Sequence, residues 1–65
     1  MKNSKHGWLV AVYISEYSDA VHVEFCETES EAYKEKEYYE VNDDVEYVTV
    51  DEVLYDLETG EYVAA

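Results

Sequence analysis

Residues 8–14 read Trp-Leu-Val-Ala-Val-Tyr-Ile and form the longest uninterrupted apolar run in the chain. A membrane-spanning helix needs roughly 20 apolar residues, so this segment is too short to cross a bilayer. β-Branched and aromatic residues favour strands, and an unbroken apolar run is typical of a strand buried on both faces. We therefore expect residues 8–14 to form the central strand of a sheet.

The next segment alternates between apolar and polar residues, as a half-exposed strand does. It follows a polar turn at residues 16–19 and predicts the second arm of an antiparallel hairpin. One face is expected to carry Val21, Val23 and Phe25, and the other Ala20, His22, Glu24 and Cys26.

A helix is predicted over residues 29–41. Thr28 and Glu31 have the spacing of a capping box, in which each side chain satisfies a backbone amide at the helix start. Asn42 suits a left-handed residue that ends the helix. The side chains expected to face the sheet are Ala32, Tyr39 and the edges of Tyr33 and Lys36.

A third strand is predicted over residues 45–50 because the segment is rich in β-branched residues. After Asp51 and Glu52, residues 53–57 and 61–64 suit a hairpin whose turn contains Gly60, and a short helix through Val53, Leu54 and Leu57 is the alternative. The expected fold is a small α+β domain over residues 1–65, with residues 1–6 flexible. It has a single-layer antiparallel or mixed sheet of β-β-α-β order, a C-terminal hairpin and one acidic helix. A right-handed crossover places the third strand beside the first.

The charge balance is extreme. The 65 residues include seventeen Asp and Glu against four Lys and no Arg, for a formal charge of −13. A nucleic acid or an anionic membrane would be repelled, because both are bound through Lys and Arg. The expected partner is a basic protein surface, most commonly one that itself binds DNA or RNA. Solubility alone accounts for a net charge of only about 2 to 8 in a small domain.

The chain has too few side chains that could act together as catalytic groups or metal ligands for us to expect an enzyme. On a strand, His22 and Cys26 lie about 13 Å apart, too far to share one metal ion or to form a catalytic pair. Residues 42–46 offer oxygen ligands but lack the glycine and the distal glutamate of a calcium loop. We therefore predict no enzymatic activity, no metal and no cofactor. The single cysteine excludes an internal disulfide, and we expect a reduced cytoplasmic protein, in the host cytoplasm if a phage encodes it.

The acidic helix and the turn after it form the candidate binding surface. Carboxylates recur about every 4 Å along the helix axis, close to the phosphate spacing of about 3.4 Å along one DNA strand. Exposed tyrosines among them are typical of protein-binding surfaces. The predicted partner-binding residues are Glu29, Glu31, Glu35, Glu37, Tyr38, Glu40, Asp43, Asp44 and Glu46.

Two hypotheses follow from these features. Small size, acidity and an α+β scaffold are similar to those of phage and mobile-element DNA mimics, such as uracil-DNA glycosylase inhibitors and anti-restriction or anti-CRISPR proteins. The likeness is one of type, with no shared motif, and it implies a non-enzymatic inhibitor that blocks a nucleic-acid-binding protein. The alternative is an acidic adaptor for an ordinary basic protein surface, or a homodimer joined through the sheet.

Overall fold

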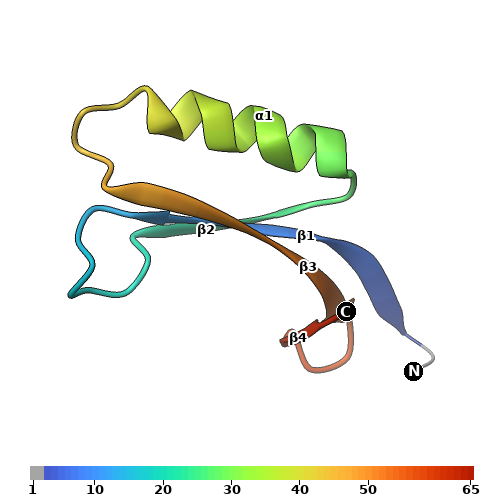
Figure 1. Cartoon of the computed structure of the whole chain (residues 1–65). Helices are drawn as coiled ribbons and strands as arrows, with labels where there is room; N and C mark the ends of the chain where they lie inside the picture. The colour runs from blue at the N-terminus through green and yellow to red at the C-terminus, as the bar shows by residue number, and fades with distance from the viewer. Residues whose placement is uncertain (1–2) are drawn as a thin grey trace.

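The sheet has four strands, and one helix lies across one of its faces (Figure 1). The computed structural model describes residues 3–65. The elements in chain order are β1 (Ser4–Tyr13), β2 (His22–Cys26), α1 (Glu29–Glu40), β3 (Tyr47–Asp56) and β4 (Tyr62–Ala64). The strand order is β2-β1-β3-β4 and every neighbouring pair is antiparallel. The α+β class, the central position of the apolar run and the C-terminal hairpin are confirmed.

β1 begins at Ser4, four residues before the expected start at Trp8. Residues 4–6, expected to be flexible, pair with the second half of β3, from Ser4 opposite Asp56 to His6 opposite Leu54. The side chains of this segment are polar and give no apolar pattern from which a strand could be predicted. Backbone pairing, however, needs no apolar side chain. At the other end Ile14 lies outside the strand and is exposed.

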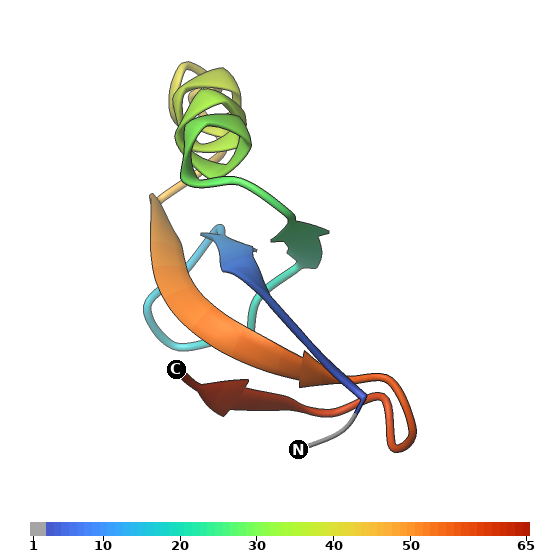
Figure 2. The same cartoon turned by 90° about the vertical axis from the view of Figure 1, so that its right-hand side faces the viewer.

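β3 is one continuous strand of ten residues, so the expected break at Asp51 and Glu52 is wrong. Both residues are paired to β1, opposite Leu9 and Trp8. Residues 53–56 therefore continue β3 and exclude the alternative short helix. The hairpin to β4 turns at Gly60, whose φ of 75° is left-handed and whose N–H donates to the Asp56 carbonyl over 2.8 Å. Figure 2 shows how strongly β3 twists on its way to this hairpin.

The helix begins at Glu29 as the sequence predicts, with one of the two side-chain-to-amide bonds of the expected capping box, and it ends by a different route. The Thr28 hydroxyl accepts from the Glu31 N–H over 3.2 Å, and the Glu31 carboxylate accepts from the same hydroxyl over 3.0 Å. Asn42 was expected to be left-handed, but no residue other than Gly60 has a positive φ in the described chain. Its side-chain oxygen instead accepts from the Asp44 N–H over 2.9 Å, which turns the chain without a left-handed residue.

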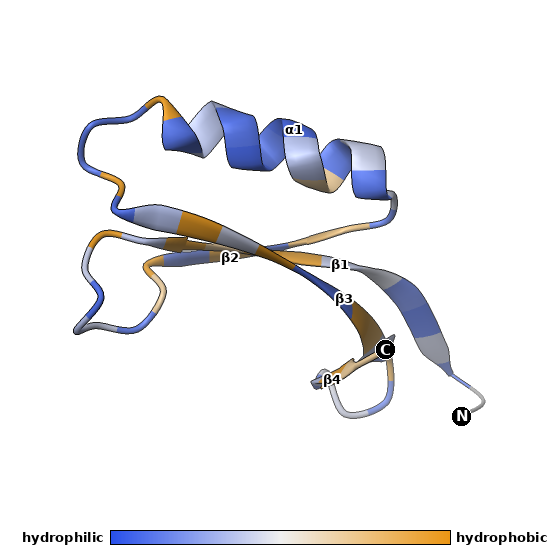
Figure 3. Cartoon of the chain, in the orientation of Figure 1, coloured by the Kyte–Doolittle hydropathy of each residue, from blue (hydrophilic) through white to orange (hydrophobic). Residues whose placement is uncertain are grey.

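The hydrophobic core lies between the helix and the middle of the sheet. Its buried members are Val10, Val12, Cys26, Ala32 and Val48. Directly opposed residues in antiparallel strands share a face, so the pairing of Val10 with Glu24 and Val50 puts all three on the helix side. Tyr39 is half-buried against this core, whereas Tyr33, expected at its edge, is 49% exposed. Figure 3 shows the resulting contrast between the polar helix and the apolar middle of the strands.

The opposite face of the sheet carries no helix, and we call it the open face. It is formed by Lys5, Gly7, Leu9, Ala11, Tyr13, Val23, Phe25, Tyr47, Thr49, Asp51, Val53, Tyr55, Tyr62 and Ala64. Val53 and Ala11 are buried here, outside the core cluster under the helix. Aromatic rings order this face, because Tyr13 stacks on Tyr47 at 4.5 Å and Phe25 lies 5.7 Å from Tyr55.

Candidate functional site

The predicted partner-binding residues lie on several sides of α1 and in the segment that follows it. Six of them are on α1, Asp43 and Asp44 follow it in the loop, and Glu46 directly precedes β3. Only Glu35 among the nine is partly buried, and the other eight are exposed. The surface is therefore accessible along its whole length, about 18 Å for a helix of twelve residues.

The helical repeat separates these residues into two sides. Glu31, Glu35 and Tyr38 follow one another at spacings of four and three residues, so they share the side of α1 that looks toward β2. Glu40 lies on the other side with Lys36, whose ammonium group donates to it over 2.6 Å. The single acidic track expected along the helix is thus divided, and the negative charge of the Glu40 side is partly compensated by Lys36.

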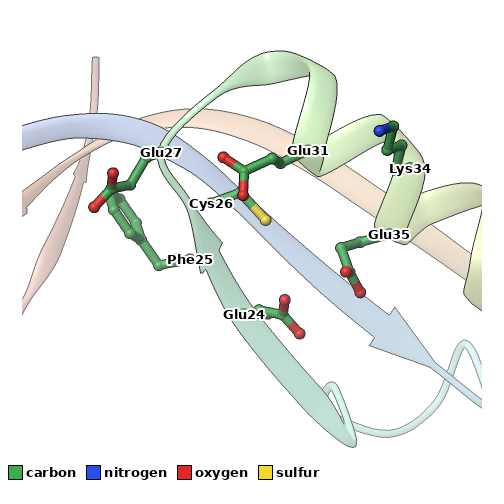
Figure 4. Close-up of a pocket in the computed structure, with 7 residues that line it drawn as sticks. All are labelled: Glu24, Phe25, Cys26, Glu27, Glu31, Lys34 and Glu35. Carbon is green, nitrogen blue, oxygen red and sulfur yellow. The ribbon is translucent and has the colours of Figure 1, made fainter.

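Glu31 and Glu35 line a pocket between β2 and the first half of α1, which we call the acidic groove (Figure 4). Its volume is about 390 Å³, and its lining is Glu24, Phe25, Cys26, Glu27, Glu31, Lys34 and Glu35. The carboxylates of Glu24 and Glu35 face each other from strand and helix in Figure 4, while Phe25 and Glu27 point to the other side of β2. Four carboxylates and one ammonium group line the groove, so its net charge is negative.

Of the seven residues that line the groove, only Glu31 and Glu35 are among the predicted binding residues. Glu24 is the missing carboxylate that faces Glu35 across the groove. It was placed correctly on the same face of its strand as His22 and Cys26, but the helix was not assigned to that face. The alternation of β2 contained the necessary signal, because a helix that packs on the Cys26 side must bring its carboxylates next to Glu24. Glu27, which follows β2, forms an ion pair with Lys5.

Cys26 lies at the floor of the groove and is 5% exposed. Burial raises the pKa of its thiol, and the negative charges of Glu24, Glu35 and Glu31 raise that pKa further. A thiol must ionise to act as a nucleophile or a metal ligand, so this environment makes Cys26 unreactive at neutral pH.

His22, on the same face of β2 as Cys26, is held in a polar contact with Glu24. Its Nε2 lies 3.1 Å from the Glu24 carboxylate, and its ring lies 5.3 Å from that of Tyr39. Within residues 3–65 there is no group of three His, Cys, Asp or Glu side chains that is arranged to hold a metal ion.

The tyrosines of the helix divide as their spacing predicts. Tyr38 is 70% exposed beside the groove, while Tyr39 is half-buried against the core, and their rings meet edge to face at 5.1 Å. The nearby carboxylates and the partial burial of the ring raise the pKa of the Tyr39 hydroxyl, with burial as the larger cause. Tyr38 therefore offers a large amphipathic contact next to the carboxylates.

Comparison of the chain with protein-family models, curated proteins and solved structures finds no match. In the described part of the chain, no helix has the length and apolar character that crossing a membrane requires.

Proposed function

We propose that the protein is a non-enzymatic inhibitor that mimics nucleic-acid charge and occupies the binding surface of a DNA- or RNA-binding protein. The observation that carries this proposal is the acidic groove with its exposed surroundings on α1. Glu24, Glu31 and Glu35 concentrate negative charge at one place, while Glu37, Asp43 and Asp44 add exposed carboxylates elsewhere on the helix and beyond its end.

The arrangement suits a basic partner that normally binds a polyanion. The helix fixes the spacing of the Cα atoms that carry the carboxylates, as the backbone fixes the spacing of phosphates along a duplex. A formal charge of −13 also attracts a basic partner over long distances, which raises the rate of association. Tyr38 supplies the packing contact that carboxylates alone lack.

The proposal places the protein in the cytoplasm, where nucleic-acid enzymes of the host are found and a single cysteine stays reduced. Restriction, CRISPR and DNA-repair enzymes, which phage and mobile elements counter, are the target classes that it favours. The other candidate class, an acidic adaptor for a basic surface that binds no nucleic acid, is distinguished by competition.

The first test is an affinity capture from bacterial lysate, repeated with excess duplex DNA and with excess duplex RNA. We expect a nucleic-acid-binding protein to be captured and then released by the nucleic acid that it normally binds. A captured protein that stays bound in the presence of both competitors contradicts the mimicry and establishes the adaptor.

The second test compares two double variants that remove the same charge. Glu31→Gln with Glu35→Gln removes two of the four carboxylates of the groove and retains the side-chain oxygen that accepts from Thr28. Glu58→Gln with Glu61→Gln neutralises two exposed acids at the β3–β4 turn. We expect at least a tenfold loss of affinity for the captured protein in the first variant and less than a threefold change in the second, as measured by calorimetry. Equal losses would move the binding surface away from the groove.

A further inference from the structure

The open face of the sheet differs from every other surface of the domain in its low charge. Among the strand residues on this face, Asp51 is the one acid, although the chain contains seventeen. At its edge Lys5 and Glu27 neutralise each other in an ion pair. The remaining side chains are aliphatic, aromatic or threonine, and several are well exposed: Val23 to 48%, Tyr47 to 39% and Tyr62 to 41%.

Aromatic contacts fix the open face in place before anything binds to it. Tyr13 and Tyr47 stack with their rings 14° from parallel. Phe25, Tyr55 and Tyr62 form a second group with ring centroids 4.9 to 6.0 Å apart. An ordered apolar surface loses little side-chain entropy when it is covered.

Charge selects the partner that this face fits. A basic protein is drawn to the carboxylates on the helix side, and a nucleic acid is repelled by the whole chain. A second copy of the chain is equally acidic, so it brings the fewest carboxylates together when it approaches through the open face, where Asp51 is the one acid among the strand residues. Two sheets packed face to face lie about 10 Å apart. The two helices are then on the outside, roughly 30 Å from each other, which is several screening lengths at physiological salt.

The area of the face fits a weak dimer. The four strands contain 10, 5, 10 and 3 residues, and at about 3.3 Å by 4.8 Å for each residue they cover roughly 440 Å². Two copies would bury roughly 900 Å², a size typical of weak, transient interfaces.

We propose that two copies of the chain pack through their open faces to form a β-sandwich dimer, with both acidic helix layers on the outside. The inference does not rest on the proposed inhibitor function, because the two surfaces lie on opposite faces of the sheet. It predicts a dissociation constant in the micromolar range. It also predicts that salt strengthens the dimer, because salt screens the repulsion between two chains of like charge.

The experiment is sedimentation velocity on the isolated protein, from micromolar to near-millimolar concentration, at about 10 mM and at about 150 mM salt. We expect a concentration-dependent dimer whose dissociation constant is lower at the higher salt. A monomer at every concentration and in both salts overturns the proposal, and it would leave the face to a different protein.

Two matched variants locate the interface. Val23 on β2 and Val63 on β4 have nearly equal exposure, 48% and 45%, but Val63 is paired with Leu54 and therefore points to the helix side of the sheet. We expect Val23→Lys to weaken the dimer at least tenfold and Val63→Lys to change it less than threefold. A second pair, Tyr47→Lys on the open face and Tyr33→Lys on α1, should give the same contrast. Equal effects within both pairs would contradict the open face as the interface.

Discussion

The two faces of the sheet are formed by the same strands but have different surroundings. On the helix side, Val10 and Val12 pack under Ala32, and the rim carries Glu24 and the helix carboxylates. On the open face, Val53 and Ala11 are buried beneath neighbouring side chains of the sheet itself, and acids are nearly absent. One face thus combines a core with a charged exterior, while the other is apolar and lacks a cover. Among the strand residues, the acids therefore lie mainly on the helix side of the sheet, and the open face has one.

The largest expected effect comes from placing one carboxylate on each face. Val12 is 3% exposed under the helix, so Val12→Asp buries a charge without a partner, at a cost of several kcal/mol. A domain of this size rarely has more than about 3–5 kcal/mol of stability, and we expect the variant to be unfolded by circular dichroism. Val23→Asp on the open face should remain folded, with a loss below about 1 kcal/mol in the monomer. A folded Val12→Asp variant would show that the helix side is not the main core.

The next largest loss of stability is expected from a substitution at Gly7, where β1 and β2 pack closely. A Cβ on Gly7 would lie 2.3 Å from the Phe25 ring and 2.6 Å from the Cys26 carbonyl oxygen. The backbone atom cannot move aside easily, so Gly7→Ala should destabilise the domain by about 1–3 kcal/mol in urea unfolding.

Gly60→Ala provides the comparison for Gly7→Ala. A Cβ on Gly60 would meet the Tyr55 hydroxyl oxygen at an ordinary contact distance of 3.9 Å, and the φ of 75° is the main constraint, so the expected loss is about 1 kcal/mol. A larger loss at Gly60 than at Gly7 would contradict the close packing of Phe25 over the strand.

These two glycines illustrate what the sequence could predict. Gly60 stands in a short polar segment between two apolar ones, and its role in a turn follows from local chemistry. The close approach at Gly7 depends on which residue of β2 lies opposite, and no local pattern contains that register. The central strand, the alternation of β2 and the start of the helix at Thr28 were predictable for the same reason as Gly60.

The sequence-based prediction was weakest where backbone pairing extends a strand through residues whose polar side chains do not favour one. Ser4, Lys5 and His6 were expected to be flexible because they are polar, yet β3 extends far enough to pair with them. Asp51 and Glu52 were expected to break a strand for the same reason. The acidic groove shows the same limit, since Glu24 joins Glu31 and Glu35 only through the packing of the helix on β2.

A smaller effect on stability is expected from salt, and it tests whether the carboxylates on the helix side repel one another. Between about 10 mM and about 150 mM salt the screening length falls from about 30 Å to about 8 Å, so repulsion among carboxylates is reduced. We expect a gain of about 1 kcal/mol, or a rise in melting temperature of several degrees, at a protein concentration low enough to keep the chain monomeric. The Glu31→Gln, Glu35→Gln variant should gain less from salt than the Glu58→Gln, Glu61→Gln variant. An unchanged melting temperature in the native protein would contradict a repulsive helix side.

The smallest expected effect is on the thiol beneath the groove. Because the pKa of Cys26 is raised in the folded state, the folded protein holds the thiol proton more tightly than the unfolded chain does. This contribution to stability is complete below the unfolded pKa of about 8.5 and is lost as the pH rises through the folded value. Reaction with a thiol reagent as a function of pH should therefore give a midpoint above that of the urea-unfolded chain.

Glu24→Gln should shift this midpoint downward, because it removes the carboxylate that raises the Cys26 pKa most among the charged neighbours. Burial, the larger cause, is unchanged, so the midpoint should stay above that of the unfolded chain. Glu61→Gln removes an equal charge outside the groove and should leave the midpoint in place. A Glu24→Gln midpoint equal to that of the native protein would mean that the field of the groove does not reach the core. The acidity of the helix side would then be a feature of its surface alone.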